Sequence, residues 1–125
     1  MTIIVLTLPW PNPRLNPNRS KGVHWAATSA LRKKARAAAH MVALGAMNVA
    51  RLPRGAAGSI ALTITFVQPD RRARDRDNLL AALKPSLDGL ADALGVNDAQ
   101  FEPVLLRREY GGKPGAVRIE IGAAV

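Results

Sequence analysis

The sequence contains no cysteine among its 125 residues, which excludes disulfides, a thiol nucleophile and cysteine-based zinc or iron–sulfur sites. Aromatic residues are also few, with two Trp, one Tyr and two Phe. No apolar run approaches the ~20 residues that span a bilayer, so we expect no membrane segment. The apolar start Met1–Leu8 lacks the basic residues and the cleavage site of a secretory signal. These absences predict a soluble, cytoplasmic protein.

Acidic residues are scarce relative to basic ones. The chain has 18 Lys plus Arg against nine Asp plus Glu, a formal net charge of +9. Such a balance favours a polyanionic partner, most often nucleic acid, because binding releases counterions from phosphates. Charge alone does not separate a nuclease from a ribosomal or chromatin protein. The length suits one core, so we expect residues 1–125 to form a single domain.

The pattern of apolar and turn-forming residues predicts a mixed α+β domain in the order β-α-β-α-β-β. We expect strands at Thr2–Leu8, Ser59–Gln68, Pro103–Tyr110 and Ala116–Ile121, and helices at Ala26–Arg51 and Asn78–Leu94. The last two strands flank Gly111–Gly115, which predicts a hairpin. The architecture expected from this order is a small mixed sheet packed by two helices.

Two of these elements have an apolar face that can be assigned from residue spacing. In the second strand, alternation places Ile60, Leu62, Ile64 and Phe66 on one face, as in a half-buried strand. In the first helix, a stripe at helical spacing is expected to face the core. Its members are Leu31, Ala35, Ala38, Met41, Val42, Gly45 and Val49.

The segment Pro9–Trp25 carries four prolines, three asparagines and a glycine, and so predicts a long irregular loop. Its basic residues include Arg14, Arg19 and Lys21, and tryptophans stand near both ends. Such a mixture suits phosphates and unstacked bases. It also suits a surface loop that the tryptophans anchor to the core, and the two interpretations are compatible.

The segment Gln68–Asn78 (QPDRRARDRDN) places three of the nine acidic residues among four arginines. Asp75 and Asp77 would point to one side of an extended backbone, and Asp77 stands where an N-cap of the next helix is expected. In one interpretation these carboxylates only neutralise arginines and cap the helix. In the other they hold a divalent cation such as Mg²⁺, while the arginines gather phosphate.

Two further residues stand within reach of this segment. Lys84 follows Asp77 by seven residues, which places both on nearly the same helix face, about 10 Å apart along the axis. Helical side chains lean toward the N-terminus, so Lys84 points back toward the aspartates. An i,i+4 surface pair with Asp88 is the alternative role for this lysine. Asp98 lies in the loop after the helix and is a candidate third carboxylate.

The motif PDRRARDRDN, the helix after it and the later NDAQ resemble the RusA family of Holliday-junction endonucleases. Members of that family read P-D-R-R-x-R-D-x-D-N, then a helix, then D-D-A-Q. The opening TLPWP is also similar to the family's start, so the resemblance covers nearly the whole chain in order. Some members carry the helix lysine one turn closer to the motif, where this chain has Ala81.

The resemblance implies a Mg²⁺-dependent homodimer, with Mn²⁺ as a substitute, that resolves four-way DNA junctions by paired symmetric nicks. It implies that Asp75, Asp77 and Asp98 bind the metal and that Lys84 joins them in catalysis. The basic residues expected to contact DNA are Arg14, Arg19, Lys21, Arg71, Arg72, Arg74 and Arg76. Two alternatives stay open: a metal-dependent nuclease for other branched DNA, and a non-catalytic nucleic-acid-binding protein.

Overall fold

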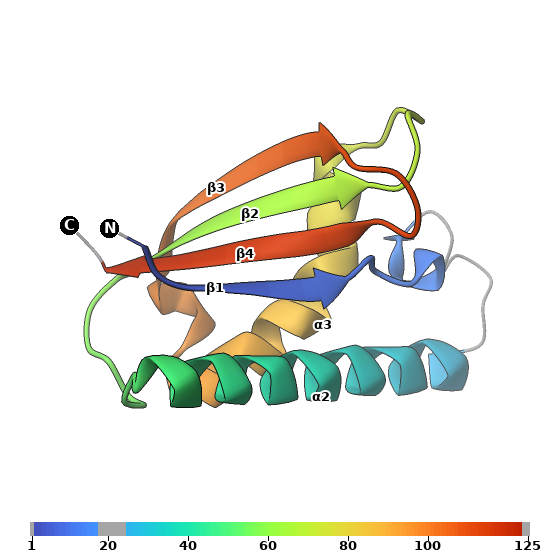
Figure 1. The fold of residues 1–125 in the computed structure, drawn as a ribbon. Coiled ribbons are helices and arrows are strands. Elements are labelled where there is room, and N and C mark those ends of the chain that lie inside the picture. Colours follow the sequence, from blue (N-terminus) through green and yellow to red (C-terminus); the bar gives the residue numbers. More distant parts are fainter. Residues whose placement is uncertain (1, 18–24, 124–125) are drawn as a thin grey trace.

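The computed structural model describes residues 2–17 and 25–123, which form a mixed α+β domain of two layers. The strands are β1 (Thr2–Pro9), β2 (Ile60–Gln68), β3 (Phe101–Tyr110) and β4 (Ala116–Ala123). The helices are α2 (Trp25–Ala50) and α3 (Arg76–Leu94), with short 3-10 turns η1 (Pro13–Leu15) and η2 (Asp98–Gln100). Figure 1 shows the helices packed against the four-stranded sheet. The predicted fold class and element order are confirmed.

The sheet has the strand order β1-β4-β2-β3. β4 pairs antiparallel with both β1 and β2, whereas β3 pairs parallel with β2 alone. The predicted hairpin between the last two strands is therefore wrong, because β2 lies between β3 and β4. The chain reverses at residues 111–115 as expected, but it crosses the end of β2 before it re-enters the sheet (Figure 1).

Glycines allow this crossing connection to lie close to the end of β2. The backbone N–H groups of Gly111 and Gly112 both donate to the carbonyl oxygen of Gln68, at 3.0 and 3.1 Å. Gly115 has φ +79°, and a Cβ there would lie 2.9 Å from Cδ of Pro69. The glycine-rich segment thus serves a crossover over β2, which needs the same residue types as a tight turn.

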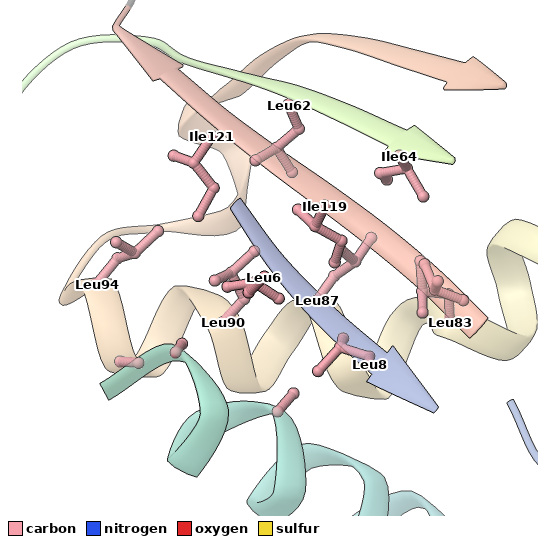
Figure 2. Packing of buried hydrophobic residues seen from close by; sticks show 14 of the residues in the cluster. Leu6, Leu8, Leu62, Ile64, Leu83, Leu87, Leu90, Leu94, Ile119 and Ile121 are labelled. Carbon is pink, nitrogen blue, oxygen red and sulfur yellow. The ribbon is translucent and has the colours of Figure 1, made fainter. Parts of the chain in front are cut away.

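The core lies between the sheet and the helices, as Figure 2 shows. The alternation predicted for β2 is confirmed, since Ile60, Leu62, Ile64 and Phe66 are all buried. Leucines of α3 cover this face, and β1 and β4 contribute alternate residues to it. The buried members shown in Figure 2 include Leu6, Leu8, Leu83, Leu87, Leu90, Leu94, Ile119 and Ile121.

The buried face of α2 differs from the prediction in its C-terminal half. Ala39, Ala43 and Met47 are buried, while Met41 is 68% exposed and Val49 is 86% exposed. Val42 and Gly45 are also exposed, whereas Leu31 and Ala35 are half-buried. The predicted stripe was wrong there because alanine, valine and methionine occur on several faces of this helix and give little contrast.

The two helices pack closely at Gly89, which is buried in α3. A Cβ at this position would overlap the carbonyl oxygen of Arg36 in α2. Near this contact the guanidinium of Arg36 donates from Nε and Nη2 to the carboxylate of Asp92, at 2.6 and 2.9 Å. Within the described ranges, neither helix is both long and apolar enough to cross a bilayer.

Candidate functional site

The carboxylates of the arginine-rich segment lie where β2 gives way to α3. Asp75 is the N-cap of α3: its φ and ψ are −72° and 127°, and its Oδ1 accepts a hydrogen bond from the backbone N–H of Asp77 at 2.8 Å. The helix therefore begins at Arg76, two residues before the predicted start, and Asp77 lies in its first turn. The expectation that Asp77 is the cap was wrong, because the D-x-D spacing offers two candidates and Asp75 takes the role.

Lys84 links the middle of α3 to the turn that follows the helix. Its ammonium nitrogen lies 2.6 Å from Oδ1 of Asp88 and 2.6 Å from Oδ2 of Asp98. The i,i+4 pair with Asp88, which was the alternative role of Lys84, is therefore present, and the contact with Asp98 was not predicted. Among the described residues, no hydrogen bond or ion pair joins Lys84 to Asp75 or Asp77. Because Asp77 and Lys84 are seven residues apart in one helix, Asp98 is brought to the helix face that carries Asp77.

Asp98 owes its position to the turn η2, which is fixed at both ends. Asn97 caps this turn by accepting the backbone N–H of Ala99, and its own N–H donates to the Gln100 side chain. The Gln100 amide nitrogen donates in turn to the carbonyl oxygens of Ala56 and Gly58, at 3.0 and 2.9 Å. The NDAQ sequence thus holds Asp98 through a capping box anchored to the loop before β2.

The electrostatics of this cluster keep both groups charged. Hydrogen bonds to Asp88 and Asp98 raise the pKa of the Lys84 ammonium above its usual value. The hydrogen bond from Lys84 lowers the pKa of Asp98 below the usual aspartate value. The lysine is about half exposed and so is Asp98, which leaves both accessible to a ligand from solvent.

The oxygen donors at the start of α3 fit the chemistry of Mg²⁺, which often takes one or two carboxylates and completes its shell with water and phosphate. Asp75 and Asp77 are both exposed there, and one oxygen of Asp75 is already engaged in capping. Across residues 2–17 and 25–123, no three His, Cys, Asp or Glu side chains gather to hold one metal ion. The Asp98 carboxylate is paired with Lys84 instead, so the role of Asp98 as a metal ligand stays a prediction.

The predicted DNA-binding residues have different surroundings. Arg14, Arg72 and Arg76 are exposed. The Arg71 guanidinium lies over the Tyr110 ring, 4.2 Å from its centroid. Arg74 turns inward, with its side chain 18% exposed and paired with Asp70. Arg19 and Lys21 lie outside the described residues.

Trp10 forms one wall of a cavity that borders Asp75 at the start of α3. Its ring meets Phe66 edge-on at a centroid distance of 6.1 Å, and the Arg74 guanidinium lies 5.2 Å from its centroid. The cavity holds about 350 Å³ between residues 10–16 and the start of α3, and Asp75 lies on its border. The expectation that tryptophan anchors the loop to the core is confirmed for Trp10; the side chain of Trp25 is not among those described.

Two contacting residues, Asp70 and Arg54, were missed from the sequence. Asp70 fixes Arg74 through two oxygens, and the Arg74 hydrogen bond lowers the pKa of Asp70. The i,i+4 spacing of these two residues was a signal that could have found them. Arg54 donates to the carbonyl oxygens of Asp92 and Ala93 at the end of α3, at 2.8 and 3.0 Å. That contact joins distant segments, and no local pattern indicates it.

Comparison with known proteins adds one relative and no activity. No protein-family model matches the chain. The chain is 44% identical over 96 residues to a protein of Xylella fastidiosa (strain Temecula1 / ATCC 700964) described as an uncharacterized protein. The match covers 77% of this chain and 61% of the relative, so the chain spans about three fifths of the relative's length. That description names no substrate or reaction.

Proposed function

We propose that this protein is a Mg²⁺-dependent endonuclease that cuts four-way DNA junctions by paired symmetric nicks. The observation that carries the proposal is the Lys84–Asp98 ion pair of 2.6 Å. It joins the helix that follows the arginine-rich motif to the NDAQ turn, and both segments belong to the resemblance to the RusA family. A basic chain with carboxylates at the start of a helix and a lysine–aspartate pair further along it has the electrostatics that phosphodiester hydrolysis needs.

Asp75 and Asp77 would hold the cation in this proposal. Mg²⁺ bound there would lower the pKa of a bound water and stabilise negative charge on the phosphate. Asp75 is oriented by its capping hydrogen bond, and Asp77 lies beside it in the first helical turn. Lys84 adds a positive charge on the same helix face and holds Asp98 there. The exposed arginines would contact the DNA backbone and orient it without reading sequence.

Paired nicks require two active sites related by symmetry, and one chain offers one carboxylate cluster. A two-fold dimer would match the symmetry of a four-way junction, so we propose a homodimer. Light scattering would then give a mass near twice the 13.3 kDa of the chain. A monomer on the junction would contradict the mechanism of paired cuts.

A non-catalytic nucleic-acid-binding protein is the second candidate. It is favoured by the absence, within the described part of the chain, of a ready group of three metal-binding side chains. Labelled four-way junctions, flaps and linear duplexes, each with Mg²⁺ or EDTA, separate the candidates. Symmetric, Mg²⁺-dependent nicks in the four-way junction alone would support the proposal. Cuts in flaps or forks instead would indicate another branched substrate, and binding without cutting would support the second candidate.

A further inference from the structure

We propose that the cavity beside Asp75 binds one unstacked nucleobase of the DNA strand that passes the start of α3. This inference rests on the proposed function, because it assigns the base of a nucleotide next to the cut. The volume of about 350 Å³ lies in the ~300–1,000 Å³ range of small-ligand sites. Its border includes Arg72 and Asp75, so the cavity is continuous with the candidate site.

The walls of the cavity offer planar groups on which a base can stack. Trp10 and Arg74 both line it, and each is fixed: Trp10 by its edge-on contact with Phe66, and Arg74 by the Asp70 carboxylate. Indole rings and guanidinium planes are the groups on which proteins stack unpaired bases. Because Arg74 is paired with Asp70 and lies over the Trp10 ring, we assign it to the wall of this cavity and not to phosphate binding.

Amide side chains on the cavity wall supply hydrogen-bonding groups. Asn12 and Asn78 both line it. Oδ1 of Asn12 accepts the backbone N–H of Arg14, and within the described ranges no partner engages the amide nitrogen of either asparagine. The edges of nucleobases present donors and acceptors side by side, and asparagine amides pair well with them. These groups favour a base over an aliphatic ligand.

The floor of the cavity is apolar. Leu79 and Ala82, both buried in α3, lie beneath it, and Pro11 and Pro13 come from the facing loop. A planar ring would cover these carbons while its edge meets the amides. The phosphate of the same nucleotide would then lie toward Arg72 and the carboxylates. A nucleotide therefore matches all three parts of the cavity: its ring covers the apolar floor, its base edge meets the amides and its phosphate meets the basic border.

A free nucleotide carries the same chemistry as a nucleotide within a strand. We assign the strand, because the exposed Arg72 on the cavity border and the net charge of +9 suit a polyanion. Fluorescence anisotropy against a four-way junction, with deoxynucleoside 5′-monophosphates as competitors, separates the two sources. A free nucleotide that binds at least as tightly as the junction would overturn the assignment to a strand.

The first test is nuclear magnetic resonance of the ¹⁵N-labelled protein in EDTA, without any variant. The probes are a deoxynucleoside 5′-monophosphate and 2-deoxyribose 5-phosphate, which lacks the base. We expect the nucleotide to shift the Trp10 indole N–H and the Asn78 side-chain signals, and the sugar phosphate to leave them unchanged. Equal shifts with both probes would show a phosphate site only, and unchanged signals with both at millimolar concentration would overturn the proposal.

The second test fills the cavity and removes the base in one cycle. Asn78→Leu is expected to weaken junction binding in EDTA by about 5–150-fold, the range for losing one stacked base. A junction with an abasic nucleotide at the expected cleavage position should bind the wild-type protein more weakly by a similar factor. The same abasic junction should bind Asn78→Leu no more weakly than the intact junction does. Asn48→Leu, at an exposed position of α2, is the matched control and should bind as wild type does.

The two proposals fail in different ways. Normal binding and cleavage of the abasic junction, by both wild type and Asn78→Leu, would overturn the base site and leave the nuclease intact. Shifts of the Trp10 and Asn78 signals by the nucleotide, together with no cleavage under any metal, would overturn the nuclease and leave the base site supported.

Discussion

The ammonium nitrogen of Lys84 lies 2.6 Å from Oδ2 of Asp98, so one lysine connects α3 to the turn that precedes β3. Its other contact, with Asp88, holds it along the helix. The two residues come from segments that no local pattern connects. Their contact makes Lys84 the centre of the candidate site.

Replacing Lys84 is therefore expected to reduce catalysis more than binding. Lys84→Met removes a positive charge close to the predicted position of the phosphate, and we expect junction cleavage to fall about tenfold or more. Junction affinity in EDTA should stay within about threefold, because most of the basic charge is elsewhere. Lys33→Met, at an exposed position of α2, is the control. An equal loss of cleavage in both variants would show a general charge effect instead.

Asp75 caps α3 and is proposed to bind the metal ion, and two substitutions separate these roles. Asparagine is as good an N-cap as aspartate, so Asp75→Asn should keep the free energy of unfolding within about 0.5 kcal/mol while removing a charged ligand. Asp75→Ala loses the cap as well and should destabilise the protein by about 1 kcal/mol. We expect both variants to lose cleavage. Retained cleavage in Asp75→Asn would limit Asp75 to capping.

Gly89 and Gly45 should respond in opposite directions to alanine. Gly89→Ala places a methyl group against the Arg36 carbonyl oxygen and should cost about 1–3 kcal/mol, because α2 has to move away. Gly45 has nothing within 4 Å of an added Cβ, so Gly45→Ala should stabilise by about 0.5–1 kcal/mol. Urea unfolding of both variants measures the difference. Equal stability would contradict the close helix packing.

The Arg36–Asp92 pair predicts an acid-sensitive part of the stability. The hydrogen bond from Arg36 lowers the pKa of Asp92 in the folded protein. A carboxyl with a lowered native pKa stabilises the fold above its unfolded-state pKa, and this contribution is lost as pH falls through the native pKa. Asp92→Asn should therefore lower stability slightly at pH 7, and the difference from wild type should shrink as pH falls below the ordinary aspartate pKa of about 3.9. A difference that stays constant on acidification would indicate a steric cause.

Local sequence patterns predicted most of the helices and strands but did not predict which strands pair in the sheet. Alternation identified the buried face of β2, because Ile60, Leu62, Ile64 and Phe66 contrast with the residues between them. The glycines at residues 111–115 correctly marked a reversal. Nothing local indicated that β2 would separate the strands on either side of that reversal, since strand order depends on contacts between distant segments.

The candidate site was predicted in composition and only partly in geometry. The motif indicated Asp75, Asp77 and Asp98 as candidates, and helix periodicity indicated that Lys84 shares a helix face with Asp77. The contact between Lys84 and Asp98 was not predicted. The choice of N-cap was missed because it depends on backbone angles at Asp75. The cavity was missed because it forms between Trp10 and Asn78, residues that are remote in sequence.

The carboxylates at the start of α3 are proposed to support DNA cleavage. The most direct measurement compares wild type, Asp77→Asn and Asp92→Asn on labelled four-way junctions with Mg²⁺, and measures binding in EDTA. Asp92 lies in the same helix and is paired with Arg36, so it controls for loss of one charge. We expect Asp77→Asn to abolish symmetric nicking while binding survives, and Asp92→Asn to cut as wild type does. Absence of cleavage by the wild-type protein under any metal, with Asp77→Asn binding DNA as well or better, would contradict the account.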